Sequence, residues 1–175
     1  MLTTKQTMIS KFTSLLSFLF ILSFTGPLSA QIDSTKIFLK NYLGAAAGIT
    51  TGYGLSYRFC PNKAGIQLTF APTSNKYHTR ISAGLTFLFR MVETERANLF
   101  IYQGNHFLFY KDTYTYYYGN SHTSKEYYNM YNGIGLGIEF IIVKRVSLNI
   151  MGGYAAYENF NRLSLTGETG LFFKF

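Results

Sequence analysis

The chain has 175 residues and a formal net charge of +8, and 18% of its residues are aromatic, tyrosine and phenylalanine without tryptophan. The single cysteine, Cys60, excludes an internal disulfide framework. The basic residues are scattered, with only Lys144 and Arg145 adjacent. This scatter argues against nucleic acid as a partner, because nucleic-acid binding needs a basic patch or stripe.

The first 30 residues have the pattern of a secretory signal peptide. Two lysines give a positive start, and the apolar run Phe12–Phe24 follows. Gly26-Pro27 ends this run, and Ala30 offers a cleavage site. The run is shorter than the roughly 20 residues that a membrane-spanning helix needs. The sequence therefore predicts a cleaved signal peptide, residues 1–30, and one exported domain, residues 31–175, with a charge of about +6.

After the signal peptide, apolar side chains recur with a period of two residues rather than with the helical period of 3.6. Alternation of this kind predicts β-strands, with one apolar face and one face of small or charged residues. The fifth segment is apolar on both faces at its ends, and Gln103–His106 interrupts its middle, so its orientation stays open. The eight expected strands are Lys36–Gly48, Tyr53–Phe59, Ile66–Phe70, Arg80–Arg90, Asn98–Tyr110, Gly133–Phe140, Ser147–Tyr154 and Arg162–Phe175.

The last of these segments is the longest regular alternation. Leu171, Phe173 and Phe175 lie on its apolar face, and Glu168 and Lys174 lie on the opposite face. About 9–11 residues suffice for a tilted strand to cross a bilayer. Strands of soluble proteins are usually about 5–6 residues long. The length of about 14 residues therefore favours a membrane strand.

The connections between the strands alternate in length. The second, fourth and sixth are tight, at Pro61–Lys63, Glu93–Arg96 and Lys144–Arg145. The third and fifth, Pro72–His78 and Lys111–Glu126, are longer, and the first and seventh, near Thr50-Thr51 and Asn159, are moderately short. Outer-membrane barrels have short periplasmic turns, longer outer loops and an even strand number. This parity predicts an all-β, eight-stranded antiparallel up-and-down transmembrane β-barrel.

Charged residues occupy the small-residue faces of several predicted strands. A soluble barrel would turn its apolar faces inward, and a membrane barrel would turn them toward lipid. Alternation alone allows both, and the signal peptide, the strand length and the terminal phenylalanine favour the membrane barrel. Because buried charges need partners, we expect a polar network that plugs the lumen: Arg58, Arg80, Arg90, Glu139 and Glu168, extended by Lys174.

Three segments carry a resemblance to a known family: Gly52–Phe59, Gly133–Phe140 and the tail Leu171–Phe175. Together with the signal peptide they resemble the small eight-stranded outer-membrane β-barrel proteins, which have the architecture of the OmpX and OmpA transmembrane barrels. The resemblance implies that Leu171, Phe173 and Phe175 form the recognition signal for the barrel-assembly machinery. It also implies outer-membrane lipid as surroundings and a monomeric state, and it implies no catalytic residues and no cofactor.

Tyrosines cluster around the longest connection. One interpretation is an aromatic girdle at the outer membrane interface. The other is an adhesive outer surface, because tyrosine and short polar residues make adaptable contacts. The residues are Tyr114, Tyr116, Tyr117, Tyr118, Tyr127 and Tyr128, followed by Tyr131.

Two other functions remain as alternatives to a non-enzymatic barrel with a structural or loop-display role. His122, Ser124 and Glu126 place a base, a hydroxyl and a carboxylate close together, as a lipid-modifying barrel enzyme would need. A soluble periplasmic barrel that binds a small apolar ligand would show the same alternation. The other histidines, His78 and His106, have no ligand-type neighbour at metal-binding spacing, so the sequence predicts no metal site.

Overall fold

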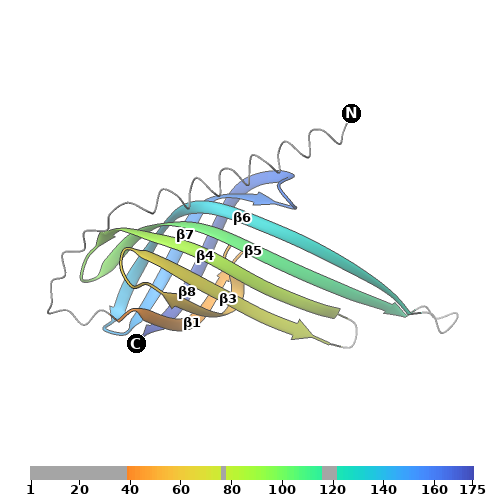
Figure 1. Ribbon diagram of the computed structural model, residues 1–175, viewed down its shortest axis with the longest axis horizontal. Helices are drawn as coiled ribbons and strands as arrows, with labels where there is room; N and C mark the ends of the chain where they lie inside the picture. Colours follow the sequence, from red (N-terminus) through yellow and green to blue (C-terminus); the bar gives the residue numbers. More distant parts are fainter. Residues whose placement is uncertain (1–38, 76–77, 116–121) are drawn as a thin grey trace. The chain divides into compact units, whose positions relative to one another are not determined.

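The computed structural model describes residues 39–75, 78–115 and 122–175, with residues 113–115 and 122–123 described by their backbone alone (Figure 1). The predicted signal peptide lies outside these residues. Eight strands form: β1 Asn41–Gly48, β2 Gly52–Phe59, β3 Ala64–Ser74, β4 His78–Glu93, β5 Ala97–Thr115, β6 His122–Val143, β7 Val146–Tyr157 and β8 Arg162–Lys174. No helix among the described residues is long and apolar enough to cross a membrane.

The strands pair in a closed ring. Each strand is antiparallel to the next in the chain, and β1 pairs with β8 to complete the circle. At the start of β1, Asn41 and Phe175 exchange backbone hydrogen bonds of 3.2 and 2.9 Å. The predicted eight-stranded antiparallel up-and-down barrel is therefore confirmed.

The two ends of the barrel differ. We call the end that holds Asn41 and Phe175 the terminus end, where β2–β3, β4–β5 and β6–β7 are joined by short connections. We call the opposite end the loop end. There β5 and β6 extend beyond the other strands as a paired ribbon (Figure 1).

Side chains alternate between the two faces of the wall as the sequence predicts. On β6, Leu136 points outward and is 55% exposed, whereas Glu139 points inward and is 2% exposed. The same parity places Arg58 of β2 inside at 3% exposure. Large apolar side chains therefore cover the outside of the ring. The interior holds polar and charged side chains together with two small apolar clusters, one around Phe100 and one around Phe172.

Two sequence predictions about strand limits are wrong. The predicted connection Lys111–Glu126 is largely strand, because β5 continues to Thr115 and β6 starts at His122, with Lys111 opposite Glu126. The first strand begins at Asn41, whereas Leu39 and Lys40 are not in a strand and residues 36–38 lie outside the described part. Cross-strand pairing extends polar segments that show no apolar alternation of their own.

The fifth strand runs through its polar middle without a break. Tyr102, Gly104 and His106 of β5 face the lumen. Gln103 and Asn105 lie on the outward parity, where their amides bond to each other at 2.9 and 3.1 Å. These hydrogen bonds satisfy both amides on the outer wall. The structure thus shows which face of β5 points into the lumen, a point that the sequence left open.

The start of β2 departs from the predicted face. Tyr53, expected on the apolar face, contacts the ring of His106 in the lumen, with ring centroids 5.8 Å apart. Gly52 and Gly54 on either side have φ values of 80° and 124°, which side-chain-bearing residues rarely adopt. These two glycines therefore let the chain turn from the wall toward the interior.

Candidate functional site in the barrel lumen

Arg58 lies at the centre of the polar cluster near the terminus end. Its Nε and Nη2 donate hydrogen bonds to Gln67 Oε1 at 3.0 and 2.6 Å. With its amide oxygen turned toward Arg58, Asn149 accepts a further bond from Nη1 at 2.8 Å. The guanidinium also lies 4.4 Å from the centre of the Phe172 ring. Amide oxygens and an aromatic face, rather than a direct carboxylate contact, thus hold this buried charge.

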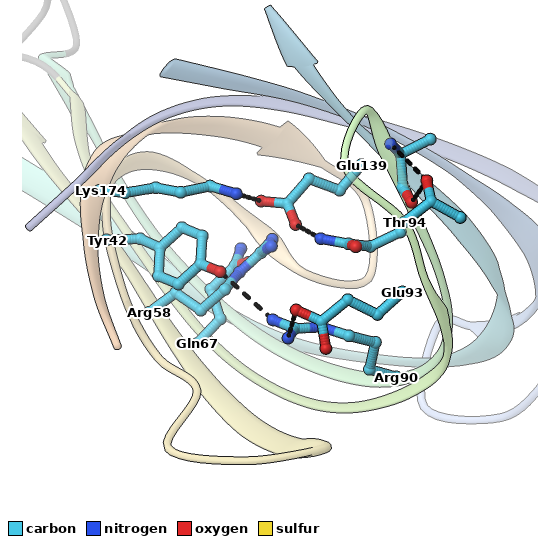
Figure 2. A network of polar contacts seen from close by, with 10 residues as sticks. Tyr42, Arg58, Gln67, Arg90, Glu93, Thr94, Glu139 and Lys174 are labelled. Carbon is cyan, nitrogen blue, oxygen red and sulfur yellow. Dashed lines mark hydrogen bonds and ion pairs between the residues drawn. The ribbon is translucent and has the colours of Figure 1, made fainter. Parts of the chain in front are cut away.

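Glu139 forms the buried ion pair of the same cluster. Its Oε1 lies 3.3 Å from Nζ of Lys174, and its Oε2 accepts a 2.6 Å bond from the Asn98 amide. Figure 2 shows Lys174 and Glu139 pointing toward each other across the lumen. The lysine comes from β8 and the glutamate from β6, so the ion pair connects strands that are not neighbours.

Arg90 occupies the edge of this cluster. It donates to the Tyr42 hydroxyl at 3.3 Å and to Glu93 at 3.0 Å (Figure 2). A cavity of about 20 Å³ remains beside Arg58, Arg90 and Glu139. That volume accommodates about one water molecule.

Two predicted members of the network lie elsewhere. Arg80 is exposed near the loop end, where its guanidinium lies 4.7 Å from the centre of the Tyr110 ring. Glu168 is buried but pairs in register with Gly48 at the far end of β1, six residues along β8 from Lys174. At about 3.3 Å per residue the two sites are about 20 Å apart along the strand. The predicted single network is thus one cluster around Arg58, a separate buried glutamate and an exposed arginine.

The turn between β1 and β2 enters the lumen beside Glu168. Thr50 and Thr51 are both 0% exposed, although the sequence places them in an ordinary connection. A Cβ at Gly104 would lie 2.6 Å from the Thr50 carbonyl oxygen, and a Cβ at Gly84 would collide with the Thr51 carbonyl. These inward-facing glycines of β4 and β5 provide the space that the turn occupies. We call the turn Ile49–Thr51 the plug turn.

A histidine and a serine hold the plug turn from the side. His106 Nδ1 donates to the Ile49 carbonyl at 2.7 Å, because a carbonyl can only accept. In the neutral ring, Nε2 then accepts from the Ser82 hydroxyl at 2.9 Å. Ser82 also accepts a 3.3 Å bond from the Tyr53 backbone N–H. This serine–histidine pair is fully buried and engaged with the turn.

Glu168 holds the same turn from the other side. Its Oε1 accepts hydrogen bonds from the hydroxyls of Thr50, Tyr102 at 3.5 Å and Thr166 at 3.3 Å. The carboxylate thus joins the plug turn to β5 and β8. Sequence reasoning identified Glu168 but not these partners.

Several residues of the lumen were missed although the alternation could have found some of them. Gln67, Asn98 and Asn149 lie on the inward parity of their strands and are buried. They lie on the same face of their strands as the buried charged residues. Counting neutral amides as members of that face would therefore have identified them from the sequence. The plug turn gave no such signal, because Thr50 and Thr51 are ordinary turn residues in sequence.

The remaining predicted sites lie outside this lumen. Leu171 and Phe173 face outward on β8, Phe175 directly follows the strand, and all three are exposed. Tyr127 and Tyr128 are exposed on β6 near the ribbon, whereas Tyr116–Tyr118 and the side chains of Tyr114 and His122 lie outside the described part. Glu126, one of the residues of the enzyme hypothesis, pairs with Lys111 at 2.9 Å, and that hydrogen bond lowers the pKa of the Glu126 carboxyl. Within the described residues, no group of three histidine, cysteine or acidic side chains is placed to hold a metal ion.

Comparisons with known proteins give similarity of structure but none of sequence. No family model matches the sequence, and no curated protein matches it. Among solved structures, the chain is similar to the N-terminal β-barrel domain of Pseudomonas aeruginosa OprF, with 12% identity and a TM-score of 0.47 over 78% of this chain and 96% of that one. The strand pairing itself establishes the eight-stranded ring.

We expect Glu139→Gln to lower the free energy of unfolding by about 3–5 kcal/mol, because it leaves the buried Lys174 ammonium without its carboxylate. Urea unfolding followed by the gel mobility of unboiled samples measures the change. The matched control is Glu126→Gln, which breaks an exposed pair and should change stability little. Equal effects of the two variants would contradict a buried ion pair.

We expect Gly84→Ala to destabilise the barrel by about 1–3 kcal/mol, because the added methyl group collides with the backbone of the plug turn. Gly167→Ala is the control, since a Cβ there meets nothing within 4 Å. The same unfolding measurement compares the two. A Gly84→Ala variant as stable as the Gly167→Ala variant would mean that the turn does not pack against β4.

Proposed function

We propose that this protein is an integral outer-membrane β-barrel of a Gram-negative envelope, with a lumen closed by its own side chains and a structural or loop-display role. The observation that carries the proposal is the inverted arrangement of the wall. Leucine, isoleucine and phenylalanine rows are exposed on the outside while arginine, lysine and glutamate are buried inside. Water-soluble proteins have the opposite arrangement.

The outer surface explains why a membrane is the proposed solvent. Exposed apolar side chains occur on every strand, including Leu43 of β1, Leu85 of β4 and Ile150 of β7. The largest apolar patch of a soluble monomer is typically about 300–600 Å², and a band that encircles a barrel exceeds this. Contact with the hydrocarbon of a membrane removes the free-energy cost of exposing these apolar side chains to water. A soluble barrel for an apolar ligand would need these rows inside, where the lumen instead places charged side chains and amides beside two small apolar clusters.

The backbone supports the same proposal. Polar backbone groups must be paired within the bilayer core, which restricts spanning structures to helices and closed barrels. The ring is closed by the β1–β8 pairing. The strands β7 and β8 have 12 and 13 residues, enough for the roughly 9–11 residues of a tilted membrane strand.

The direction of insertion follows from the two ends. The short connections and both chain ends of the barrel lie at the terminus end, as at the periplasmic side of known barrels. The β5–β6 ribbon would then project outside the cell, with Lys111 and Glu126 in water. We further propose that Leu171, Phe173 and Phe175, which form an outward row on β8, serve as the assembly signal.

A closed lumen supports a non-porin role. An eight-stranded ring leaves an interior just wide enough for side chains. The Arg58 cluster fills it near the terminus end, and the plug turn fills it around Glu168. The proposed contribution is therefore mechanical, or the presentation of the outer ribbon, and not transport or catalysis.

The membrane proposal predicts that position along β6 decides the effect of a charge. Leu136 and Tyr128 both point outward and are both 55% exposed. Leu136→Arg should lower the stability of the inserted barrel by about 2–4 kcal/mol, since it puts a cation near mid-membrane, and Tyr128→Arg near the ribbon by about 0–1 kcal/mol. Unfolding in lipid vesicles, together with recovery of the wild-type chain in the outer-membrane fraction, provides the test. Equal effects in both variants, or wild-type protein in the soluble periplasmic extract, would refute the membrane assignment.

The closed lumen predicts that the purified protein does not conduct ions steadily in a planar lipid bilayer. The physical reason is that two filled levels of the lumen leave no continuous water path between the ends. A wide porin recorded in the same bilayers shows that the measurement detects open channels. Steady porin-like current from the wild-type barrel would refute the proposed plug.

A further inference from the structure

Glu168 is a buried carboxylate with one oxygen fully engaged and the other without a partner. The side chain belongs to a residue that is 5% exposed. Its Oε1 accepts from three hydroxyls, those of Thr50, Tyr102 and Thr166. Its Oε2 makes no hydrogen bond to any described residue. The two oxygens of one carboxylate therefore face different surroundings.

A second unpartnered oxygen lies on the same side. Thr51 Oγ1 is buried in the plug turn and also lacks a hydrogen-bond partner among the described residues. A Cβ built on Gly48 would lie 2.5 Å from Thr51 Oγ1 and would collide with Glu168 Oε2. Both oxygens thus lie close to the same point beside the Gly48 α-carbon, where no side chain would fit.

The charge of Glu168 is not balanced by a basic side chain in this part of the barrel. The buried arginine and lysine of the described chain, Arg58 and Lys174, lie at the level of Tyr42, six residues along β1 from Gly48. His106 is closer, but its two nitrogens are engaged with the Ile49 carbonyl and the Ser82 hydroxyl, a pattern that a neutral ring satisfies. Hydroxyl donors stabilise a carboxylate without neutralising it, and a buried charge needs neutralisation or pairing.

We propose that Glu168 Oε2 and Thr51 Oγ1 form a binding site for a hard monovalent cation of the sodium class. Carboxylate, hydroxyl and water oxygens are the ligands that hard cations prefer. One positive charge balances the single carboxylate. Calcium usually takes 6–8 oxygen ligands, often from several carboxylates, and this site offers one. The bound cation connects β8 to the plug turn and so fastens the closure of the lumen.

Thermal unfolding of the folded protein in sodium chloride, with choline chloride keeping the ionic strength constant, tests this site. We use pH 8.5, where an imidazole is neutral. The unfolding temperature of the wild type should rise with sodium and reach a plateau, because a ligand that binds only the folded state stabilises it. Thr51→Val should abolish the sodium response while keeping the charge and the shape, and Thr51→Ser should retain it.

Two further variants separate the site from general effects of salt and charge. Glu168→Gln should lose the sodium response, whereas Glu139→Gln, which alters the other buried carboxylate, should retain it although the barrel is less stable. Sodium-23 NMR line broadening by the wild type and Thr51→Ser, but not by Thr51→Val, would show the same site without unfolding and serves if Glu168→Gln does not fold. Equal unfolding temperatures of the wild type in sodium and choline would overturn the proposal. So would a sodium response that Thr51→Val retains in full.

Discussion

The small interior of an eight-stranded ring is the constraint on which the other features depend. Closing the ring pairs the backbone, and it also limits the lumen to the volume of a few side chains. Any segment that enters must displace side chains, and inward glycines at 84 and 104 are where the plug turn does so. The same limit brings charged groups from distant strands together, as for Glu139 of β6 and Lys174 of β8.

The two groups of buried polar side chains in the lumen, one around Arg58 and one around Glu168, use different chemistry. Near the terminus end, opposite charges, amides and aromatic rings surround one another, so the cluster around Arg58 is largely self-sufficient. Around Glu168, neutral hydroxyls donate hydrogen bonds to the carboxylate, and the Ile49 carbonyl accepts a hydrogen bond from His106. No basic side chain of the described chain pairs with the carboxylate there. The hydroxyls of the plug turn can change position more readily than the Arg58 guanidinium, which amide oxygens and an aromatic ring hold in place. The proposed cation site would make the level around Glu168 the one whose stability responds to dissolved sodium.

Alternation in the sequence predicted the strands and placed Leu136 and Glu139 on opposite faces, because a period of two residues is a direct property of an extended backbone. The connection lengths were needed to predict the ring. The signal peptide pattern and the last strand were needed to predict which face points outward. Alternation failed where neighbours decide the structure. The segment from Lys111 to Glu126 has no apolar alternation, and its described parts, residues 111–115 and 122–126, become strand by pairing with each other. Thr50 and Thr51 enter the lumen because glycines far away in sequence leave room there. The residues around Thr50 give no sign of that room. The alternation also predicted that Arg80 points into the lumen. It is exposed instead, because it lies near the loop end of β4.

The seam between β1 and β8 has a consequence for how the barrel forms. Seven of the eight strand pairs join neighbours in the chain and can zip from a hairpin, whereas the seam must unite Asn41 with Phe175 from opposite ends of the domain. Loop-closure entropy opposes contacts of such high sequence separation, so they form late unless something holds the ends together. Until then the outer strands present two unpaired edges, and an unpaired edge is a template for association with other chains. Joining of these two edges is accordingly the step at which a growing sheet becomes a separate cylinder.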